Sequence, residues 1–335
     1  MKKIHIIYAL LATLFFGSCE HDHLYFVNKH TATVGIRIDW KPAILNDLQL
    51  NGVTAVAFDS KSGDLLEVFP TYDGRDSVLY VPLPIGVWDI FFYNNTPPEY
   101  QYMTFDNVKH RSTFSADYVT TETKRTKSAQ IVDDPIPIAN PEIMASANVR
   151  KLEITKDMID IHYNKPDYYI KETAKIFNIE AHRKIMTWVF TAEVEGLRYA
   201  AGAPYAHLIH DHAGYAFGGD HGKDSYVLQE FPWDKVVWDK NKHNGIIRKE
   251  VTSFHYTPYD EHHHLLDVDF KLLDGKSHIL HEHFDNPHIT DSIDPKDGVL
   301  KHWVHFKLKL PEAIGAGGSG FEPGSSEWDD IVIPL

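Results

Sequence analysis

Residues 78–94 read Val-Leu-Tyr-Val-Pro-Leu-Pro-Ile-Gly-Val-Trp-Asp-Ile-Phe-Phe-Tyr-Asn. Two runs rich in aromatic and β-branched residues, 78–83 and 87–94, flank the tripeptide Pro84-Ile85-Gly86. A proline and a glycine this close together mark a tight turn. Short apolar runs of this composition, bounded by turn residues, are typical of strands. The segment therefore predicts two consecutive β-strands.

The chain before this segment shows the same organisation. Between residues 31 and 40, Val34, Ile36 and Ile38 alternate with polar or small residues, which indicates a strand with one buried face. Residues 53–58 and 65–69 are two more apolar runs, and the polar stretch between them contains a glycine and suits a turn. Strands that recur about every ten residues with turns between them favour a β-sandwich.

The chain after this segment reads as a second set of strands. Residues 133–141 contain three prolines and predict an extended linker. Beyond it we expect strands at 151–155, 185–194, 227–231, 246–256, 265–273, 277–284 and 300–310. Asp274-Gly275 predicts a hairpin, and residues 168–177 are the one expected helix. Strands do not alternate with long helices, which excludes a doubly wound α/β sheet. We predict an all-β protein with two tandem β-sandwich domains, residues 31–138 and 139–335.

Length and charge limit the classes of function. The chain has 335 residues, enough for about two domains. It has 33 basic and 47 acidic side chains, so its formal charge is −14. Such a surface repels phosphate backbones, and we expect no nucleic-acid partner. The single cysteine excludes a disulfide framework within one chain and any site built from several cysteines.

The N-terminus has the pattern of a bacterial lipoprotein signal. Lys2 and Lys3 precede an apolar stretch at 4–16, and the only cysteine, Cys19, follows small residues. We predict a signal peptide at 1–18, acylation of Cys19 and a tether at 19–30. Two acyl chains give stable anchoring. The acidic patch at 20–23 resembles the export tag of surface-exposed lipoproteins, so we expect an outer-membrane protein exposed at the cell surface. An ordinary signal peptide with a chance cysteine is the alternative.

Histidine accounts for 22 residues, of which 15 follow residue 200. Two segments share the pattern H-x-x-H-x-H. On a strand, residues two apart project to one face, so His210 with His212, or His281 with His283, could bind zinc weakly with a carboxylate. Histidines on the solvent face of a sheet need no metal, however. We assign no metal ligand and keep a histidine-based metal-binding protein as an alternative.

No pattern predicts an enzyme. Gly315, Gly317 and Gly320 match the spacing of a dinucleotide fingerprint, but the chain after them is too short for a βαβ unit, so 315–320 reads as a flexible linker. No G-x-S-x-G motif occurs. We predict no catalytic residues and no cofactor.

Two tryptophans offer another function. Trp233 and Trp238 lie five residues apart and are flanked by charged residues. Exposed aromatic faces could stack on sugar rings, which would make this a glycan-binding surface lipoprotein. Burial in the core is the competing interpretation, because large aromatic side chains are mostly buried.

The segment 83–94, the strand 34–40, the cysteine at 19, the proline-rich joint and the tail Glu327-Trp-Asp-Asp-Ile-Val-Ile-Pro334 together resemble the fimbrillin-like lipoproteins. These include subunits, anchors and tips of type V pili and an uncharacterised branch that is most similar here. The resemblance implies two transthyretin-like, Greek-key sandwich domains, a lipid anchor, no enzyme activity and assembly by strand exchange with other fimbrillin-like subunits. A host or glycan ligand is a further expected partner.

Two features bear on assembly. The terminal segment 328–335 reads as a short strand behind the glycine linker, and Ile331, Val332, Ile333 and Leu335 are its strand-exchange candidates. This strand could be donated to another subunit or fold back onto its own domain. Shaft subunits of the family are cleaved after an arginine, but Arg37, Arg111 and Arg125 do not match that site. We therefore expect a minor, anchor or tip component.

Overall fold

The structure is a computed structural model. It describes residues 30–41, 50–71, 78–121, 135–219, 221–233, 235–254, 264–284, 289–296, 298–313 and 329–330. These residues form four β-sheets and two short α-helices. The predicted all-β class is confirmed.

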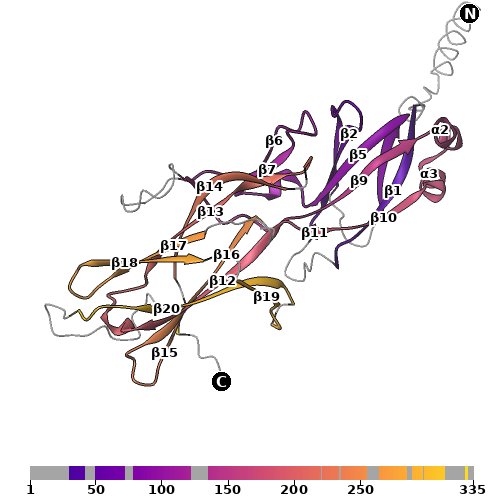
Figure 1. Ribbon diagram of the computed structural model, residues 1–335. Coiled ribbons are helices and arrows are strands. Elements are labelled where there is room, and N and C mark those ends of the chain that lie inside the picture. The colour runs from indigo at the N-terminus through magenta and orange to yellow at the C-terminus, as the bar shows by residue number, and fades with distance from the viewer. Residues whose placement is uncertain are drawn as a thin grey trace, which may run out of the picture.

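Two of the sheets make the first sandwich. The three-stranded sheet has the order β10 (Ile176–Glu180), β1 (Thr31–Asp39), β4 (Leu79–Pro84). The five-stranded sheet has the order β11 (His182–Arg183), β9 (Ala145–Ile154), β5 (Gly86–Asn94), β2 (Val53–Asp59), β3 (Leu65–Thr71). Their facing side chains form one core, and the helices α2 (Lys156–His162) and α3 (Asp167–Thr173) lie at one end of this sandwich (Figure 1).

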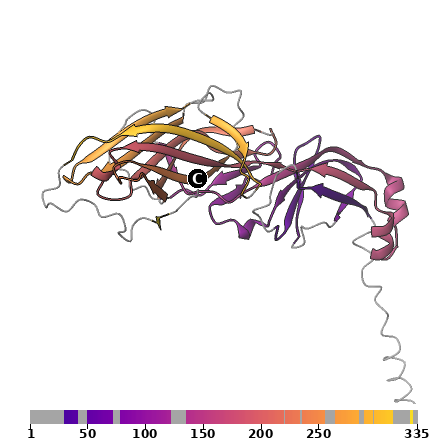
Figure 2. The ribbon, with the colours of Figure 1, turned by 90° about the horizontal axis from the view of Figure 1, so that it is seen from below.

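The other two sheets make the second sandwich. The six-stranded sheet has the order β19 (Ile289–Ile293), β20 (Leu300–Lys309), β12 (Ile185–Glu195), β16 (Gly245–Phe254), β15 (Lys235–Trp238), β21 (Asp329–Asp330). The seven-stranded sheet has the order β18 (Ser277–Phe284), β17 (His264–Lys271), β13 (Tyr205–Ala216), β14 (His221–Pro232), β8 (Ile136–Ile138), and β7 (Ser115–Tyr118) joins β13 to β6 (Met103–Asp106). Figure 2 shows the two sandwiches end to end along one axis.

The predicted turn near Gly86 carries the chain from one sheet to the other. Ile85 joins β4 to β5, which belong to different sheets. The Trp88 indole N–H donates to the Pro84 carbonyl oxygen at 2.9 Å, and this folds the ring over the turn. A β-carbon at Gly86 would lie 3.0 Å from that ring. The turn therefore requires a residue without a side chain at position 86.

Strand β5 is buried on both faces because it separates two cores. Ile90 and Phe92 face the core of the first sandwich. Phe91 and Tyr93 face a third apolar cluster, which lies between the sandwiches and includes residues from β7, β13, β14 and β16. In that cluster the Phe114 and Phe217 rings stack with centroids 4.3 Å apart. The two sandwiches therefore share a packed core.

The expected helix at 168–177 is only partly correct. Helix α3 ends at Thr173, and Ile176 already begins β10, where Phe177 pairs with Ile36 of β1. Parallel pairing with β1 therefore takes over the last part of the predicted helical pattern. Helix α2, which is as short as α3, is not among the expected elements, and it follows β9 directly.

The expected domain division between residues 138 and 139 does not coincide with the sheets. Strands β6, β7 and β8 precede residue 139 but belong to the second sandwich. Strands β9, β10 and β11 follow it but belong to the first. The proline-rich joint is itself partly a strand, since Ile136–Ile138 pairs with β14 at the edge of the sheet. Pro137 is tolerated there because edge strands need fewer backbone donors.

Candidate functional site

Most of the residues predicted to act in anchoring and strand exchange lie outside the described part of the chain. Cys19 is one of them, and Ile331, Val332, Ile333 and Leu335 are the others. Of the expected terminal strand 328–335, the structure describes Asp329–Asp330 as β21. This short strand shows which part of the fold the end of the chain reaches.

Strand β21 pairs with β15 at the margin of the six-stranded sheet. The pairing is parallel, with Asp329 beside Lys235 and Asp330 beside Val236. On its other side β15 pairs with β16 in antiparallel register. Without β21, β15 would be an edge strand with backbone N–H and C=O groups available for pairing, and such an edge is a template for an added strand.

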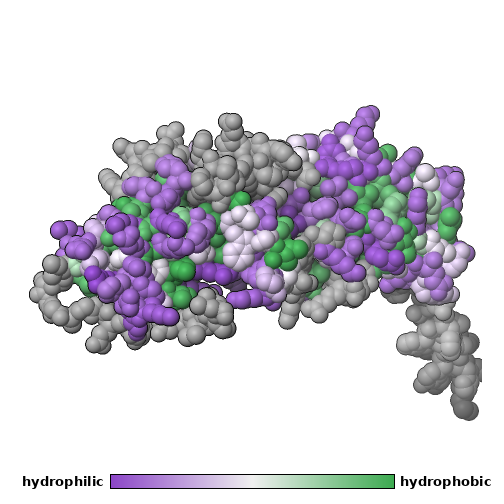
Figure 3. Space-filling view, turned by 60° about the horizontal axis from the view of Figure 1, so that its bottom comes forward, coloured by the Kyte–Doolittle hydropathy of each residue, from purple (hydrophilic) through white to green (hydrophobic). Residues whose placement is uncertain are grey.

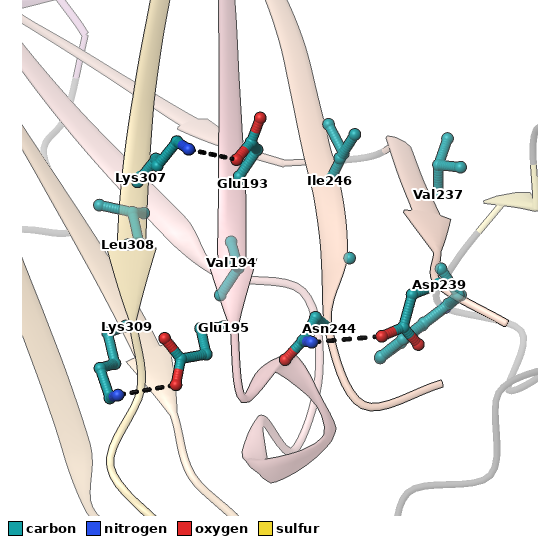
Figure 4. A pocket seen from close by; sticks show the side chains of 12 residues that line it. Glu193, Val194, Glu195, Val237, Asp239, Asn244, Ile246, Lys307, Leu308 and Lys309 are labelled. Atoms are coloured by element: carbon teal, nitrogen blue, oxygen red, sulfur yellow. Dashed lines mark hydrogen bonds and ion pairs between the residues drawn. The ribbon is translucent and has the colours of Figure 1, made fainter. Parts of the chain in front are cut away.

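A shallow groove of about 540 Å³ lies beside this edge, on the six-stranded sheet (Figure 4). Val237 and Trp238 of β15 and Ile246 of β16 supply apolar lining. Strands β12 and β20 supply two ion pairs on the far side: Glu193 Oε2 lies 3.2 Å from Lys307 Nζ, and Glu195 Oε1 lies 2.7 Å from Lys309 Nζ. The groove thus has apolar side chains and Asp239 on the β15 side and two ion pairs on the far side.

Hydrogen bonds and ion pairs shift the pKa of three side chains that line the groove. Hydrogen bonds from Lys307 and His305 lower the pKa of Glu193, and the Glu195 carboxylate raises the pKa of Lys309. Burial alone would raise the pKa of Asp239, but backbone N–H donors, those of His243 and Asn244 foremost, bring it below its ordinary value. Glu193 and Asp239 are thus held by specific hydrogen bonds at the wall of the groove.

The tight loop after β15 also fixes the edge in place. Asp239 Oδ1 accepts the His243 backbone N–H at 2.9 Å, and Asp239 Oδ2 accepts the Asn244 side-chain N–H at 3.2 Å. The hairpin from β15 to β16 is therefore closed by one side chain. A rigid edge with apolar side chains next to it suits an extended peptide, which binds through its main chain and fits alternate side chains to the surface.

The two tryptophans of the glycan alternative do not form a shared platform. Trp233 is 0% exposed and packs in the core of the second sandwich, near Phe231 and Phe306. Trp238 is half-buried and lines the groove beside β15. The glycan-binding prediction is therefore wrong for Trp233, and core packing is the correct interpretation.

The histidine segments lie in one sheet but do not converge. Strand β17 separates β13 from β18, so His210 and His281 are two strands apart. His210 is buried with its ring 6.1 Å from that of Tyr118, whereas His281 Nδ1 lies 2.6 Å from Asp267 Oδ1. His283 is exposed on β18, and the side chain of His212 lies outside the described part.

Two searches of the described residues were negative. No group of three or more His, Cys, Asp or Glu side chains in this part of the chain could hold a metal ion. No helix within the described ranges has the length and apolarity needed to cross a bilayer.

Sequence reasoning missed the edge strand itself. Residues 235–238 form a strand of only four residues, which gives little periodicity. In the sequence they read as the end of a segment bounded by two tryptophans. The useful signal is the pair of adjacent valines, Val236 and Val237, before a turn closed by Asp239. β-Branched residues followed by an aspartate turn are typical of one arm of a hairpin.

Comparison with known proteins shows the family and the fold. Residues 18–231, well over half of the chain, match the model of a family described as a domain of unknown function (DUF5119). No curated protein sequence matches.

Among solved structures, a candidate adhesin from Bacteroides ovatus is similar with a TM-score of 0.55 and 14% identity, covering 89% of this chain and 99% of that one. The fimbrial anchor protein Mfa2 from Porphyromonas gingivalis is similar with a TM-score of 0.46 and 12% identity, covering 81% of this chain and 95% of that one. The Bacteroides ovatus structure shows that this fold occurs over nearly the whole length of another chain.

Proposed function

Because this chain belongs to the DUF5119 family and shares the fold of a candidate Bacteroides adhesin, we propose that it is a fimbrillin-like protein of the cell surface. Its role is structural or adhesive rather than catalytic, as a minor, anchor or tip component. The apolar side chains and paired charges that line the groove support a binding role.

The observation that carries this proposal is the parallel pairing of β21 with β15. It brings Asp330 to an edge strand bordered by a groove that Val237 and Trp238 line. Continuing the same register would set Ile331 beside Val237 and Val332 beside Trp238. In the proposal, this edge accepts the segment 331–335 from its own chain when the protein is alone, and from a neighbouring subunit in an assembly.

The second part of the proposal is the attachment to the membrane. Acylation of Cys19 would hold the chain on the outer membrane, and residues 20–30 would connect the anchor to β1. Two acyl chains suffice for stable attachment. The test is retention in the membrane fraction together with the mass of the N-terminal peptide, and replacement of Cys19 by alanine should abolish both the retention and the added mass.

Strand addition is tested with a chain that ends at residue 326. A synthetic peptide of residues 327–335 should bind it saturably and raise its melting temperature. A control peptide with Ile331→Asp and Ile333→Asp keeps the length but should not bind, because its apolar side chains are lost. The full-length chain should bind the first peptide much more weakly, since its own segment occupies the edge.

A matched pair of variants locates the binding edge. Val237→Asp in the shortened chain should abolish peptide binding, whereas Val68→Asp should leave it unchanged. Val68 is a half-buried valine of β3, which is the edge strand of the five-stranded sheet. Binding that survives Val237→Asp and disappears with Val68→Asp would place the acceptor on the first sandwich and refute the proposal.

A further inference from the structure

One end of the first sandwich carries an unusual amount of exposed apolar side chain. Large apolar residues that are exposed number eleven among the described residues, and five of them lie here: Ile85 (57% exposed), Val87 (39%), Ile161 (51%), Tyr163 (44%) and Tyr168 (69%). We name these five residues the apolar end. Figure 3 shows hydrophobic surface mixed with polar surface over the half of the molecule that contains α2 and α3. Exposed apolar groups gathered in one place mark interaction surfaces.

Backbone pairing shows that these residues are neighbours. Val87 pairs with Glu153 and Gly86 with Ile154, so the β4–β5 turn lies beside the end of β9. Helix α2 begins two residues after β9, at Lys156, and α3 follows it. The turn and both helices therefore close the same end of the sandwich.

The chain enters the fold at this same end. Thr31, the first residue of β1, pairs with Pro84, which adjoins Ile85. The Thr33 backbone N–H donates to His162 Nδ1 at 3.2 Å, so the last residue of α2 also contacts the start of β1. Cys19 precedes Thr31 by twelve positions, and a chain of that length spans at most about 40 Å. An anchor at Cys19 thus confines this end near the surface that holds it.

The local charge also differs from that of the whole protein. Residues 156–175 contain four lysines, two aspartates before α3, one aspartate within it and one glutamate, so their charges cancel in a chain of net charge −14. Lys165 and Lys171 lie over tyrosine rings, with Nζ 5.2 Å from the Tyr169 ring centre and 5.5 Å from that of Tyr80. Lysines with tyrosines suit the boundary between water and lipid, where apolar stems and rings are buried and polar tips stay wet.

We propose that the apolar end rests on the lipid bilayer, so that the anchored molecule stands with α2, α3 and the β4–β5 turn against the membrane and the β15 edge pointing away. This inference rests on the proposed acylation of Cys19. The bilayer is the partner that this surface suits, because the tether keeps the apolar end near it. The balanced local charge also avoids repulsion from anionic lipid headgroups. Figures 1 and 2 place β15 in the opposite sandwich from the helices.

The test uses an environment-sensitive fluorophore on an introduced cysteine. In the acylated chain Cys19 is blocked, so a label at Tyr168→Cys reacts alone. Tyr226→Cys is the matched control, since Tyr226 is a 44% exposed tyrosine of the second sandwich. On phosphatidylcholine–phosphatidylethanolamine vesicles that contain nitroxide lipids, we expect the label at position 168 to be quenched at least threefold more than the label at 226.

Two sets of serine substitutions separate docking from mere proximity. Ile85→Ser with Ile161→Ser should reduce quenching at position 168, whereas Ile136→Ser with Ile293→Ser, which removes exposed isoleucines from the second sandwich, should not. Quenching unaffected by the first pair would overturn the inference. So would a label that is blue-shifted but not quenched by the nitroxide lipids, which is the outcome if residues 20–29 or a second copy of the chain cover the apolar end.

A separate measurement distinguishes a missing acyl anchor from an apolar end that does not contact the bilayer. Absence of acyl mass on Cys19 would refute the anchor alone. The label at position 168 in the full chain with Cys19→Ala, mixed with the same vesicles at millimolar lipid, then decides the inference: a blue shift supports it, and an unchanged spectrum contradicts it.

Discussion

Asp89 joins three parts of the fold through one buried carboxylate. Its oxygens accept hydrogen bonds from the Lys151 backbone N–H at 2.8 Å and the Ser60 hydroxyl at 3.1 Å, and it forms an ion pair with Arg111. Arg150, 3.5 Å away, also donates to the Phe217 and Gly218 carbonyl oxygens of the second sandwich. Burial alone would raise the pKa of Asp89, but the Lys151 N–H and Arg111 bring it below its ordinary value.

Replacing Asp89 by alanine should lower the free energy of unfolding by about 3 to 5 kcal/mol, because it leaves two cations and a backbone donor without their partner. Chemical denaturation at pH 7 measures this. Asp160→Ala, at an exposed position of α2, is the control and should cost no more than about 0.5 kcal/mol. A small effect at Asp89 would mean that water takes over its contacts.

The stability of the protein should depend on pH through His162. Burial lowers its pKa, and its Nδ1 accepts the Thr33 N–H, which requires an unprotonated nitrogen. The unfolded chain takes up a proton near pH 6.5 and the folded chain only below that. The contribution of His162 to the free energy of unfolding is therefore complete above pH 6.5. It is lost as the pH falls toward the lowered pKa of the folded state.

In the His162→Gln variant, the drop in melting temperature between pH 7.5 and pH 5 should be smaller than in the parent chain. Thermal unfolding followed by circular dichroism across this range measures the difference. His283→Gln, an exposed position on β18, serves as the control and should leave the slope close to that of the parent. Identical slopes in all three proteins would contradict the role of His162.

At the scale of elements, β5 explains both the success and the limits of sequence reasoning. Its composition and its turn at Gly86 predict a strand correctly. Alternation does not reveal that Phe91 and Phe92 both have apolar surroundings, because a strand between two cores is apolar at every position. Strands of four residues or fewer, such as β15, give too little periodicity to be predicted. The twelve-residue β13 is not predicted either, because its sequence mixes histidines and small residues with few large apolar ones.

Substitutions on the two faces of β5 should therefore be equally harmful. Phe91→Ala opens the cluster between the sandwiches, and Phe92→Ala opens the core of the first sandwich. Each should lower the free energy of unfolding by about 3 to 5 kcal/mol. Denaturation curves would contradict this account of β5 if Phe91→Ala cost less than about 1 kcal/mol.

At the scale of the whole molecule, the chain crosses between the sandwiches more than once. β1 to β5 and β9 to β11 form the first, while β6 to β8 and β12 onward form the second. A linear sequence shows the proline-rich joint but not these crossings, because each strand pattern is local and pairing partners are distant. The predicted division at residue 138 fails for that reason. The predicted anchor and exchange segment fall outside the described residues and stay predictions.

Shared strands and a shared core predict that the sandwiches unfold together. Hydrogen exchange measured at increasing urea should expose the amides of β1 and β20 at the same denaturant concentration. Those strands lie in the first and second sandwich respectively. Two midpoints separated by more than about 1 M urea would show that the sandwiches are independent domains.

The account as a whole depends on whether the β15 edge receives the end of the chain, and a disulfide tests this most directly. In a Cys19→Ala background, Ile331→Cys and Val237→Cys would lie side by side if the register of β21 with β15 continues by one residue, as proposed. Mild oxidation should link them, within one chain in dilute solution and increasingly between chains at high concentration. Ile331→Cys with Val68→Cys, on the β3 edge, should stay reduced. A Val237 pair that links no better than the Val68 pair would contradict the proposed strand addition.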